Sequence, residues 1–417
     1  MARGSGRADT WLIVLGQSSQ ALGMGGISLF LPLIREDLGL SFAQAGQLAA
    51  AATLVYALMQ VPAGWLTDRY SPKKLFCAGV LGTNAMSLAF AVVHPYGWLL
   101  AVQAVSGLFR SLIFAPGMML IREQFPADRK ATAMGLYVAG GFASSVLLNI
   151  LGPLAVGPLG WRWLFVVFGG TGVLWALLYH RVGTDPHREP GAFPRLAEVR
   201  RLFGHPALWL IGVIQFARLA TAQGLAFWLP SYLVAEHAMS LAGAGAIAAT
   251  SALITAPSNL LGGWLSDRLG RPLLVIAVAL TALCASLAVL PLVGGVLPLL
   301  AVIGVNALFV QLYFGPLFGV GLHYLGQRTA GFSSGFGNFC ANAGGFAAIS
   351  ALGTIKDSTG SFTLGFQLLA GLYALALLAV LALTRTTSLT EGPVPPPAAA
   401  PAPASAARKQ EPPAGAR

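Results

Sequence analysis

The sequence predicts an all-α membrane protein with twelve transmembrane helices in two six-helix bundles. Of its 417 residues, 56% are apolar and only 9% are charged, and the mean hydropathy is +0.72. Soluble domains carry about a quarter charged residues, so water is excluded as the main solvent of this chain. The apolar residues fall in twelve runs, each close to the roughly 20 residues that cross a bilayer. Each run is therefore predicted to be one spanning helix.

Six helices are predicted before a polar central segment and six after it. The first run, which starts at Trp11, is longer than a signal-peptide core and lacks a cleavage-type ending, so we expect it to be retained. The first six predicted helices cover residues 11–34, 43–66, 75–93, 96–121, 131–156 and 163–182. The last six cover residues 207–234, 241–265, 273–290, 296–322, 332–352 and 362–383.

The other segments are too polar to cross the bilayer. Residues 183–206 are rich in Pro and Arg, and they are expected to link an N-terminal bundle (11–182) to a C-terminal bundle (207–385). Residues 1–10 are a short N-terminal tail, and residues 386–417 have almost no large apolar side chain, which predicts a disordered tail.

The excess of basic residues predicts the orientation of the chain. A net charge of +11 is compatible with nucleic-acid binding, but Lys and Arg form short clusters between apolar runs, so no nucleic-acid partner is expected. Lys and Arg in short loops are retained on the cytoplasmic side. With the N-terminus inside, only Arg35, Arg162 and Lys356 are placed outside. Both termini are predicted to be cytoplasmic, in the cytoplasmic (inner) membrane.

No metal site or cofactor is predicted. Cys77, Cys284 and Cys340 lie in apolar runs without a CxxC pair, so neither a disulfide nor a zinc site is expected. The sequence contains no phosphate-binding GxxxxGK[ST] motif and no HExxH motif, which makes an enzyme the weakest function class.

The second half of the chain repeats the first at an offset of about 199 residues. Four matches occur in the same order, and together they indicate duplicated bundles. They pair Pro32 with Pro230, GWLTDR at 64–69 with GWLSDR at 263–268, FAP at 114–116 with FGP at 314–316, and Arg129 with Arg328.

The GWLTDR and GWLSDR turns resemble the signature of the major facilitator superfamily, which has Gly, three residues and then Asp-Arg after helices two and eight. The twelve runs and the central linker agree with that resemblance, which implies a major facilitator fold and secondary transport by alternating access. Transporters of this class hold their substrate near the bilayer midplane, between the repeats. The resemblance assigns a gating role to Gly64, Asp68, Arg69, Glu123, Gly263, Asp267 and Arg268.

The resemblance also implies specific contacts for these gating residues. Asp68 is expected near Phe332 and Asp267 near Ala131, because a carboxylate is stabilised at a helix N-terminus. Arg69 is expected to pair with Glu123. The sequence departs from the signature at Ser71-Pro72, where Gly-Arg is usual, and His323 lies close to where the second half would need an acid.

Two further stretches resemble organic-anion transporters of the anion:cation symporter kind: KDSTGSFTLGF at 356–366 and GFGNFCANAGGF at 335–346. In the fourth helix those transporters usually read Arg-x-x-x-Gly-x-Gly-Glu, whereas this chain has Gln103, Gly107 and Arg110 in that stretch. An Arg therefore stands where an acid is usual. Gly152-Pro153 faintly resembles the fifth-helix signature of drug antiporters, without its upstream Gly spacing.

Two arginines lie at mid-membrane depth in the predicted helices. At 1.5 Å per residue, Arg110 is about 18 Å from Trp98 and Arg218 about 17 Å from Ala207. An Arg at the bilayer centre costs about 2.5 to 3.5 kcal/mol, so both are expected to face a watery cavity. The family resemblance places them on opposite sides of the central passage, where forked guanidinium donors suit a carboxylate. The alternative is that each is a buried Arg satisfied by helix carbonyls or by Asn and Gln neighbours.

All fourteen Asp and Glu residues are placed in loops, tails or helix ends, so neither arginine has an expected internal counter-ion. The predicted substrate is therefore a small organic anion. Neutral polar residues are expected to complete the binding site with the two arginines, although Asn and Gln also join helices in membranes. These residues are Gln17, Gln20, Gln103, Gln215, Tyr313, Asn338 and Asn342.

Several alternatives remain open at this point. A proton-linked exporter of drugs or other amphipathic solutes would need a carboxylate in the cavity, and a non-transporting sensor would need a signalling domain. Coupling is left open among anion exchange, movement of a partly protonated acid, and use of an outlying histidine such as His94 or His323. The protein is expected to be a monomer in contact with membrane lipid.

Overall fold

The computed structural model describes residues 2–125, 130–185, 196–326 and 330–386, and all regular structure in these ranges is helical. The first half comprises α1 (Ala2–Leu29), α2 (Leu31–Leu38), α3 (Phe42–Arg69), α4 (Pro72–Val92), α5 (Tyr96–Ser111), α6 (Phe114–Glu123) and α7 (Lys130–Val182). A short helix, α8 (Leu196–Phe203), follows. The second half comprises α9 (Pro206–His237), α10 (Leu241–Leu269), α11 (Pro272–Val289), the short 3₁₀ helix η2 (Leu290–Leu292), α12 (Val296–Val310), α13 (Phe314–Leu325), α14 (Ala330–Thr359) and α15 (Thr363–Leu383).

The predicted all-α membrane fold is confirmed. Within the described ranges, nine helical segments are long and apolar enough to cross a bilayer. One of them, Ala139–Val182, contains two predicted spans, because α7 continues through a kink at Gly160, where φ is +76°. The helices α1 and α14 have 28 and 30 residues but are rich in Gly, Ser, Asn and Gln, which lowers their hydropathy. Together these segments account for the twelve predicted spans.

Three predicted helices are broken where a proline follows. The first breaks at Phe30, before Pro32; the fourth breaks between α5 and α6, before Pro116; the tenth breaks between α12 and α13, before Pro316. Proline has no N–H, and its ring clashes with the carbonyl four residues earlier, which opens the helix at that point. The FAP and FGP matches of the internal repeat thus mark the same structural feature in both halves.

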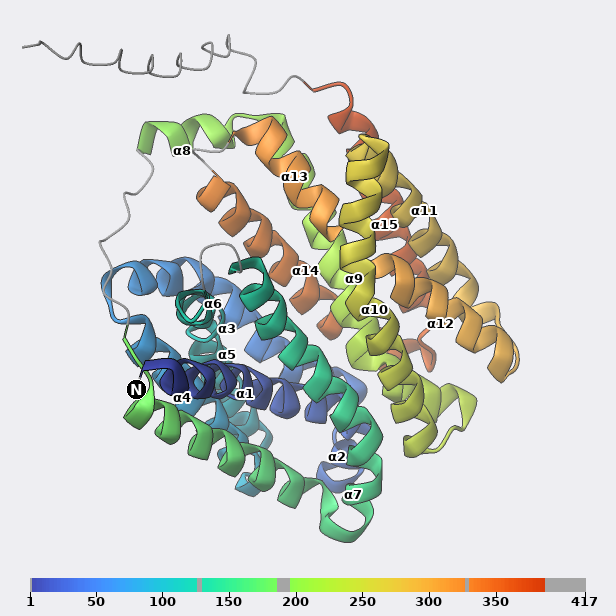
Figure 1. The fold of residues 1–417 in the computed structure, drawn as a ribbon. Helices are drawn as coiled ribbons and strands as arrows, with labels where there is room; N and C mark the ends of the chain where they lie inside the picture. Colours follow the sequence, from blue (N-terminus) through green and yellow to red (C-terminus); the bar gives the residue numbers. More distant parts are fainter. Residues whose placement is uncertain (1, 126–129, 186–195, 327–329, 387–417) are drawn as a thin grey trace, which may run out of the picture.

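Figure 1 shows the first half, in blue to green, at the lower left and most of the second half, in yellow to red, at the upper right. The segment predicted to be a polar linker contains α8, whose Arg200 and Arg201 are exposed while Leu202 is buried. The Phe203 ring packs edge-on against Phe332 of α14, with centroids 5.6 Å apart. This contact fixes the end of α8 to the second half.

The two halves meet where α3 begins and α14 ends, and we call this region the closed end. The Asp357 carboxylate accepts hydrogen bonds from the backbone N–H groups of Phe42 (2.9 Å) and Ala43 (2.6 Å), the first two residues of α3. The Phe42 ring packs against Trp228 and Phe362 of the second half, with centroids 5.9 and 5.8 Å apart. An acid of one half therefore caps a helix of the other.

Backbones also approach closely at the closed end. A Cβ added at Gly46 of α3 would lie 2.8 Å from the Ile349 carbonyl oxygen of α14, and one added at Gly353 would lie 2.5 Å from the Phe42 carbonyl oxygen. Either distance is too short for a side chain, so the crossing of α3 and α14 depends on glycine in both helices.

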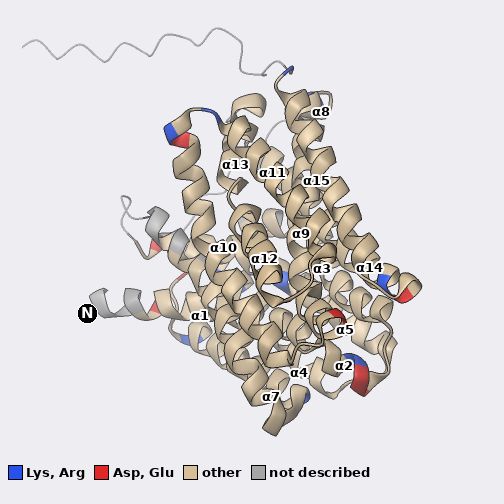
Figure 2. Ribbon diagram, turned by 90° about the vertical axis from the view of Figure 1, so that its right-hand side faces the viewer, with Lys and Arg blue, Asp and Glu red and all other residues tan. Residues whose placement is uncertain are grey.

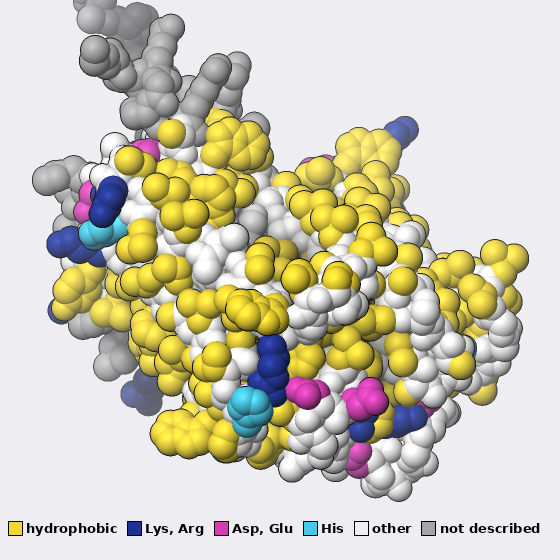
Figure 3. All heavy atoms as spheres, turned by 90° about the horizontal axis from the view of Figure 1, so that it is seen from below, with side chains coloured by type: hydrophobic (Ala, Val, Ile, Leu, Met, Phe, Trp, Pro, Cys, Tyr) yellow, Lys and Arg dark blue, Asp and Glu magenta, His cyan; other side chains and the backbone are white. Residues whose placement is uncertain are grey.

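Charged side chains surround the closed end. Arg162 pairs with Asp37 at 2.9 Å, Lys356 pairs with Glu236 at 2.7 Å, and the Arg35 guanidinium stacks 3.3 Å from the Phe42 ring centroid. Figure 3, which views the side where α2 lies, shows basic and acidic side chains together among hydrophobic ones. Most charged positions in Figure 2 likewise lie near the ends of the helices. The three basic residues predicted to lie outside therefore share one end of the molecule.

We expect Asp357→Asn to weaken the closed end. Loss of the charged cap of α3 lowers the stability of the contact between α3 and α14 by about 1 kcal/mol at this solvent-exposed site. The equilibrium between molecules with these helices in contact and molecules with them apart then shifts about fivefold toward the separated state. Distances between spin labels on α3 and α14, measured in lipid nanodiscs, should show a larger separated population. Identical distance distributions in the native and Asp357→Asn proteins would contradict this assignment.

The same contact should depend on pH. Burial alone would raise the pKa of Asp357, but hydrogen bonds from Ala43, Ser41 and Phe42 and the charge of Arg35 bring it below its usual value. A carboxyl with a lowered folded-state pKa stabilises the contact fully above the ordinary Asp pKa of about 3.9 and loses this effect as the pH falls through the lowered value. The fraction of molecules in which α3 and α14 are separated should therefore rise only in acid. This rise should be smaller in the Asp357→Asn protein, which has no carboxyl to protonate at this position.

Candidate functional site

A cavity of about 470 Å³ lies between the two halves. This volume is in the range of small-molecule binding sites, about 300 to 1,000 Å³. Its walls come mainly from α1, α4, α5 and α7 on one side and from α9, α10 and α12 on the other. Most of the lining is apolar, with Phe90, Phe142, Phe165 and Phe227 among the larger side chains.

Arg110 is the only charged side chain among the residues that line this cavity, all of which lie in the described part of the chain. Its Nη1 is 3.0 Å from the Met24 sulfur, and its guanidinium carbon lies 4.2 Å from the centroid of the Tyr56 ring. Arg110 is in the last turn of α5, where the helix dipole favours a cation. The break before Pro116 ends α5 there and so places the cation at this helix terminus.

Arg218 lies elsewhere. Its side chain is buried, with 5% of its surface exposed, and it is not among the cavity-lining residues. Its Nε donates to Gln215 Oε1 at 2.7 Å, and its guanidinium carbon lies 4.7 Å from the centroid of the Phe314 ring. Because α13 begins at Phe314, just after the break in the tenth predicted helix, this ring packs over Arg218. In this structure only one of the two arginines faces the cavity.

The neutral residues of the predicted site are also divided. Gln20 and Gln103 line the cavity. Gln17 lies behind Gln20 and accepts hydrogen bonds from Gln20 Nε2 (2.7 Å) and from the Tyr137 hydroxyl (3.0 Å). The remaining predicted residues are outside the lining: Gln215 binds Arg218, Tyr313 is fully buried, and Asn342 donates to the Asn338 carbonyl within α14.

The predicted gating residues lie at helix ends away from the cavity. Arg69, Glu123, Asp267 and Arg268 are exposed, and the Arg268 guanidinium carbon lies 5.2 Å from the centroid of the Trp264 ring. Gly64 and Gly263 have open space where a Cβ would be. The side chains of Asp68 and Ala131 lie outside the described part of the structure, so the contacts expected for Asp68 and Asp267 stay predictions.

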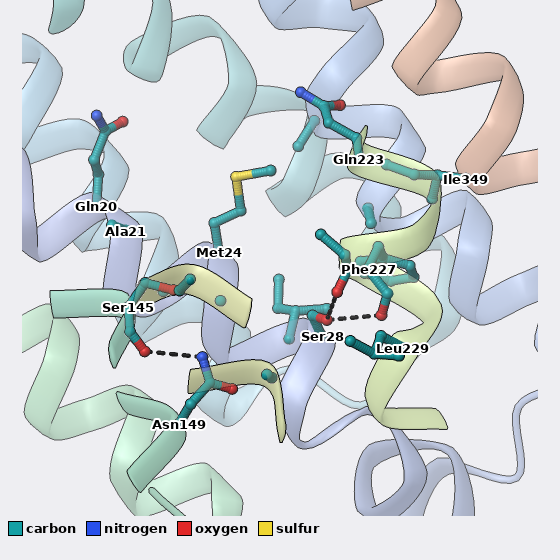
Figure 4. A pocket seen from close by; sticks show the side chains of 18 of the residues that line it. Gln20, Ala21, Met24, Ser28, Ser145, Asn149, Gln223, Phe227, Leu229 and Ile349 are labelled. Atoms are coloured by element: carbon teal, nitrogen blue, oxygen red, sulfur yellow. Dashed lines mark hydrogen bonds between the residues drawn. The ribbon is translucent and has the colours of Figure 1, made fainter. Parts of the chain in front are cut away.

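One polar contact between the halves was missed by the sequence analysis. Ser28 Oγ of α1 lies 3.2 Å from the Ala226 carbonyl oxygen and 2.7 Å from that of Phe227, both in α9 (Figure 4). Pro230 lacks the N–H that would otherwise bind the Ala226 carbonyl four residues earlier. The single Ser28 hydroxyl proton is shared between these two carbonyls, one of which is the acceptor that Pro230 leaves without a helix partner. The paired Pro32 and Pro230 were the only signal in the sequence.

Other cavity residues were also missed. Gln223 of α9 faces the cavity from the side opposite Gln20, as Figure 4 shows. The Oε1 atoms of Gln20 and Gln223 and the Oγ1 of Thr83 are buried without a hydrogen-bond partner in the described structure. Each is therefore an unpaired acceptor in the wall beside the cavity. Gln20 was predicted, whereas Gln223 and Thr83 each stand in an apolar run without a pattern that predicts a position in the cavity.

We expect Ser28→Ala to favour separation of the two halves where α1 contacts α9, which we call the cavity floor. Removing one neutral hydrogen bond and leaving a carbonyl unpaired costs about 1 kcal/mol, or about a fivefold change in the equilibrium. Spin labels on α1 and α9 beyond the cavity should report a larger separated population. Ser28→Thr, which keeps the hydroxyl, serves as the control, and an equal effect of both changes would contradict the role of the hydrogen bond.

Comparison with protein families gives one model match over most of the chain: the Major Facilitator Superfamily model matches residues 13–349. Among solved structures, a bacterial homologue of the human lysosomal transporter Spinster, in an inward-facing and occupied conformation, superposes with a TM-score of 0.77. It is 17% identical, and the match covers 93% of this chain and 98% of that one. At this identity the likeness shows the fold.

Curated relatives have names that refer to sugar acids. The chain is 25% identical over 401 residues to a probable galactarate/D-glucarate transporter of Escherichia coli K12, covering 84% of this chain and 86% of that protein. It is 26% identical over 391 residues to the hexuronate transporter of Bacillus subtilis, covering 86% and 90%. Similarity to the D-galactonate transporter of Escherichia coli O6:H1 is 26% over 264 residues and spans 57% of this chain and 61% of that protein, less than two thirds of its length.

Proposed function

The chain belongs to the major facilitator superfamily, and from this premise we propose that it is a secondary transporter that moves a small organic anion by alternating access. The relatives named for galactonate, galactarate, glucarate and hexuronate support a carboxylate as the transported group. The protein is an integral membrane protein, and its family is one of transporters, not enzymes.

The observation that carries this proposal is Arg110 in the cavity. A guanidinium keeps its proton at any physiological pH, and its forked donors match the two oxygens of a carboxylate. In the structure it contacts a thioether and an aromatic ring, and neither supplies a negative charge. An anionic cargo does. Gln20, Gln103 and Gln223 line the same cavity and are proposed to bind polar groups on the rest of the cargo.

Arg218 is proposed to have a supporting role. Its contacts with Gln215 and Phe314 tie α9 to the start of α13. The expected second cationic ligand is thus assigned to the packing of the second half in this conformation. Asn338 and Asn342, outside the lining, are assigned to α14 itself.

We propose that the closed end faces the outside of the inner membrane, with both termini in the cytoplasm. Arg35, Arg162 and Lys356 lie at this end, and basic residues of short loops are otherwise retained inside. The cavity then faces the cytoplasm in this conformation. Residues 11–182 and 207–385 are proposed to move as two bundles of a monomer surrounded by lipid, with Gly64, Asp68, Arg69, Glu123, Gly263, Asp267 and Arg268 gating the cytoplasmic ends.

The alternative of a proton-linked drug exporter required a carboxylate in the cavity. In the part of the chain that the structure describes, no residue that lines the cavity is acidic. A lipophilic cation would meet Arg110 instead of a counter-charge, so an anionic cargo fits the cavity better.

We expect Arg110→Ala to reduce transport of every accepted anion. Hydrogen bonds to a charged group contribute about 1.5 to 3 kcal/mol, so the flux at low substrate concentration should fall about 10- to 100-fold. Arg110→Lys, which keeps the charge but loses the fork, should fall between the native and Ala proteins. Counterflow in proteoliposomes with a panel of mono- and dicarboxylates measures this directly.

Arg201→Ala is the matched control, because Arg201 is an exposed arginine of α8 outside the cavity. It should leave the flux within about twofold of the native protein, as for most surface substitutions. If Arg110→Ala transports every acid in the panel as fast as the control, Arg110 is not a substrate ligand.

A further inference from the structure

The cavity has an unbalanced charge. Its lining includes one guanidinium, Arg110, and no acidic side chain. The helices packed most closely on α5 are α3 and α4, with α6 making fewer contacts. Their acids, Asp68 and Glu123, lie in the last turns of α3 and α6. The formal charge of the empty cavity lining is therefore +1.

This charge matters when the cavity closes to both sides. Alternating access requires an intermediate in which the contents of the cavity are cut off from water. Among the described residues, the Arg110 guanidinium would then keep the Met24 sulfur and the Tyr56 ring, which are weak partners for a full charge. A buried charge is tolerated when it is paired and costly when it is alone. The empty cavity should therefore close much more slowly than one that holds an anion.

Arg218 does not alter this balance. It is already removed from water in the present conformation, with 5% of its surface exposed, and its contacts are with Gln215 and Phe314. The free-energy cost of burying the Arg218 charge is therefore the same whether the cavity is empty or holds an anion. Of these two arginines, Arg110 is the one whose charge needs the transported anion as a partner.

A second carboxylate on the cargo would lack a partner. On the facing wall, Ser251 donates to the Ile247 carbonyl, Thr255 to the Ala307 carbonyl, and Asn306 to Ser286 Oγ. The Ser251 and Thr255 hydroxyl protons and one of the two Asn306 amide protons are thus already used within the second half, and a neutral amide proton carries no full charge. Gln223 and Gln311 remain on that wall as neutral groups, and a neutral amide does not balance a second negative charge. One carboxylate neutralises the cavity, whereas two leave it negative.

We propose that this transporter is a one-for-one exchanger of monoanions. The cavity closes readily when Arg110 is paired with a single carboxylate and closes slowly when it is empty or holds a dianion. Each anion carried in one direction must then be followed by an anion carried back. This inference rests on the proposed function, because it assumes that the cavity carries organic anions.

A proton is not expected to replace the returning anion. Within the described ranges, no Asp, Glu, His, Lys, Cys or Tyr lines the cavity. The titratable side chain against Arg110 is Tyr56 of α3, while α4 carries Lys73, Lys74 and Cys77 in its first two turns. The single hydroxyl proton of Tyr137 of α7 is shared between Gln17 Oε1 and the Ile113 carbonyl oxygen, each 3.0 Å away. None of these groups supplies a carboxylate or imidazole that could release a proton near neutral pH.

The test compares two modes of transport by the purified native protein in proteoliposomes. Pairs of acids that differ only by a second carboxylate serve as probes: D-galactonate with galactarate, and propionate with malonate. Uptake of each labelled acid is measured into vesicles preloaded with the same unlabelled acid and into empty vesicles, with and without an inward proton gradient and with the membrane potential clamped.

For the monoanions, uptake into preloaded vesicles should be at least about tenfold faster than uptake into empty vesicles. An unpaired arginine in a membrane raises the free energy of the closed, empty cavity, and tenfold is a lower bound for the resulting loss of rate. The proton gradient should leave uptake into empty vesicles unchanged. In each transported pair, the dianion should exchange more slowly than its monoanionic partner.

Three results would overturn the proposal: equal uptake into empty and preloaded vesicles, accumulation driven by the proton gradient, or faster exchange of the dianion in a pair. If neither acid of either pair moves in any mode, while other acids do, the same comparison is made with a transported acid and its dianionic analogue. If no acid of any kind moves, the proposed function itself fails, and this inference fails with it.

Arg110→Gln gives a second readout. A neutral cavity should close when empty, so the ratio of exchange to net uptake should fall toward one even if both rates drop. Arg201→Gln, the same change at an exposed position on α8, should keep the native ratio. A native ratio in Arg110→Gln would contradict the proposal. If the Arg110→Gln protein transports no acid, the proposal is decided by the native protein alone, from its uptake into preloaded and into empty vesicles.

Discussion

A permanent positive charge held inside the bilayer without an acidic partner is the constraint on which this structure depends. Arg110 is tolerable there because α5 ends at the next residue, so that the negative end of the helix dipole faces the guanidinium, and because the cavity admits water or cargo. The helix ends there because Pro116 prevents it from continuing. Local backbone chemistry, the placement of charge and the proposed selection of an anion are thus linked in a single segment.

The same backbone chemistry produces the contact between halves at the cavity floor. Pro230 does not break α9, but it removes the donor for the Ala226 carbonyl, and Ser28 of the other half supplies a replacement. A helix that needs a partner from the opposite half is stable in one arrangement and exposed to water in the other. Proline therefore contributes to the conformational cycle through unpaired acceptors as well as through bends.

Much of the fold could be predicted from the sequence because the bilayer imposes a fixed length on apolar runs, and the twelve predicted spans correspond to helices. The cation in the cavity was also predictable, since Arg110 lies far from any helix end of the predicted fourth span. The position of Arg218 was not, because Phe314 covers it only after the tenth predicted helix breaks. The contact of Asp357 with Phe42 joins residues 315 apart, and no local pattern encodes it.

The crossing of α3 and α14 has a consequence for the speed of the transport cycle. Because Gly46 and Gly353 bring backbone against backbone, no side chain has to adopt one rotamer at these two positions on each closure. Fixing such side chains costs up to about 2 kcal/mol each in conformational entropy, whereas glycine has no side chain to order. Helices that meet at glycine can separate and come together again with a small entropic barrier at these positions. A small barrier suits a transporter that changes conformation for every molecule it carries.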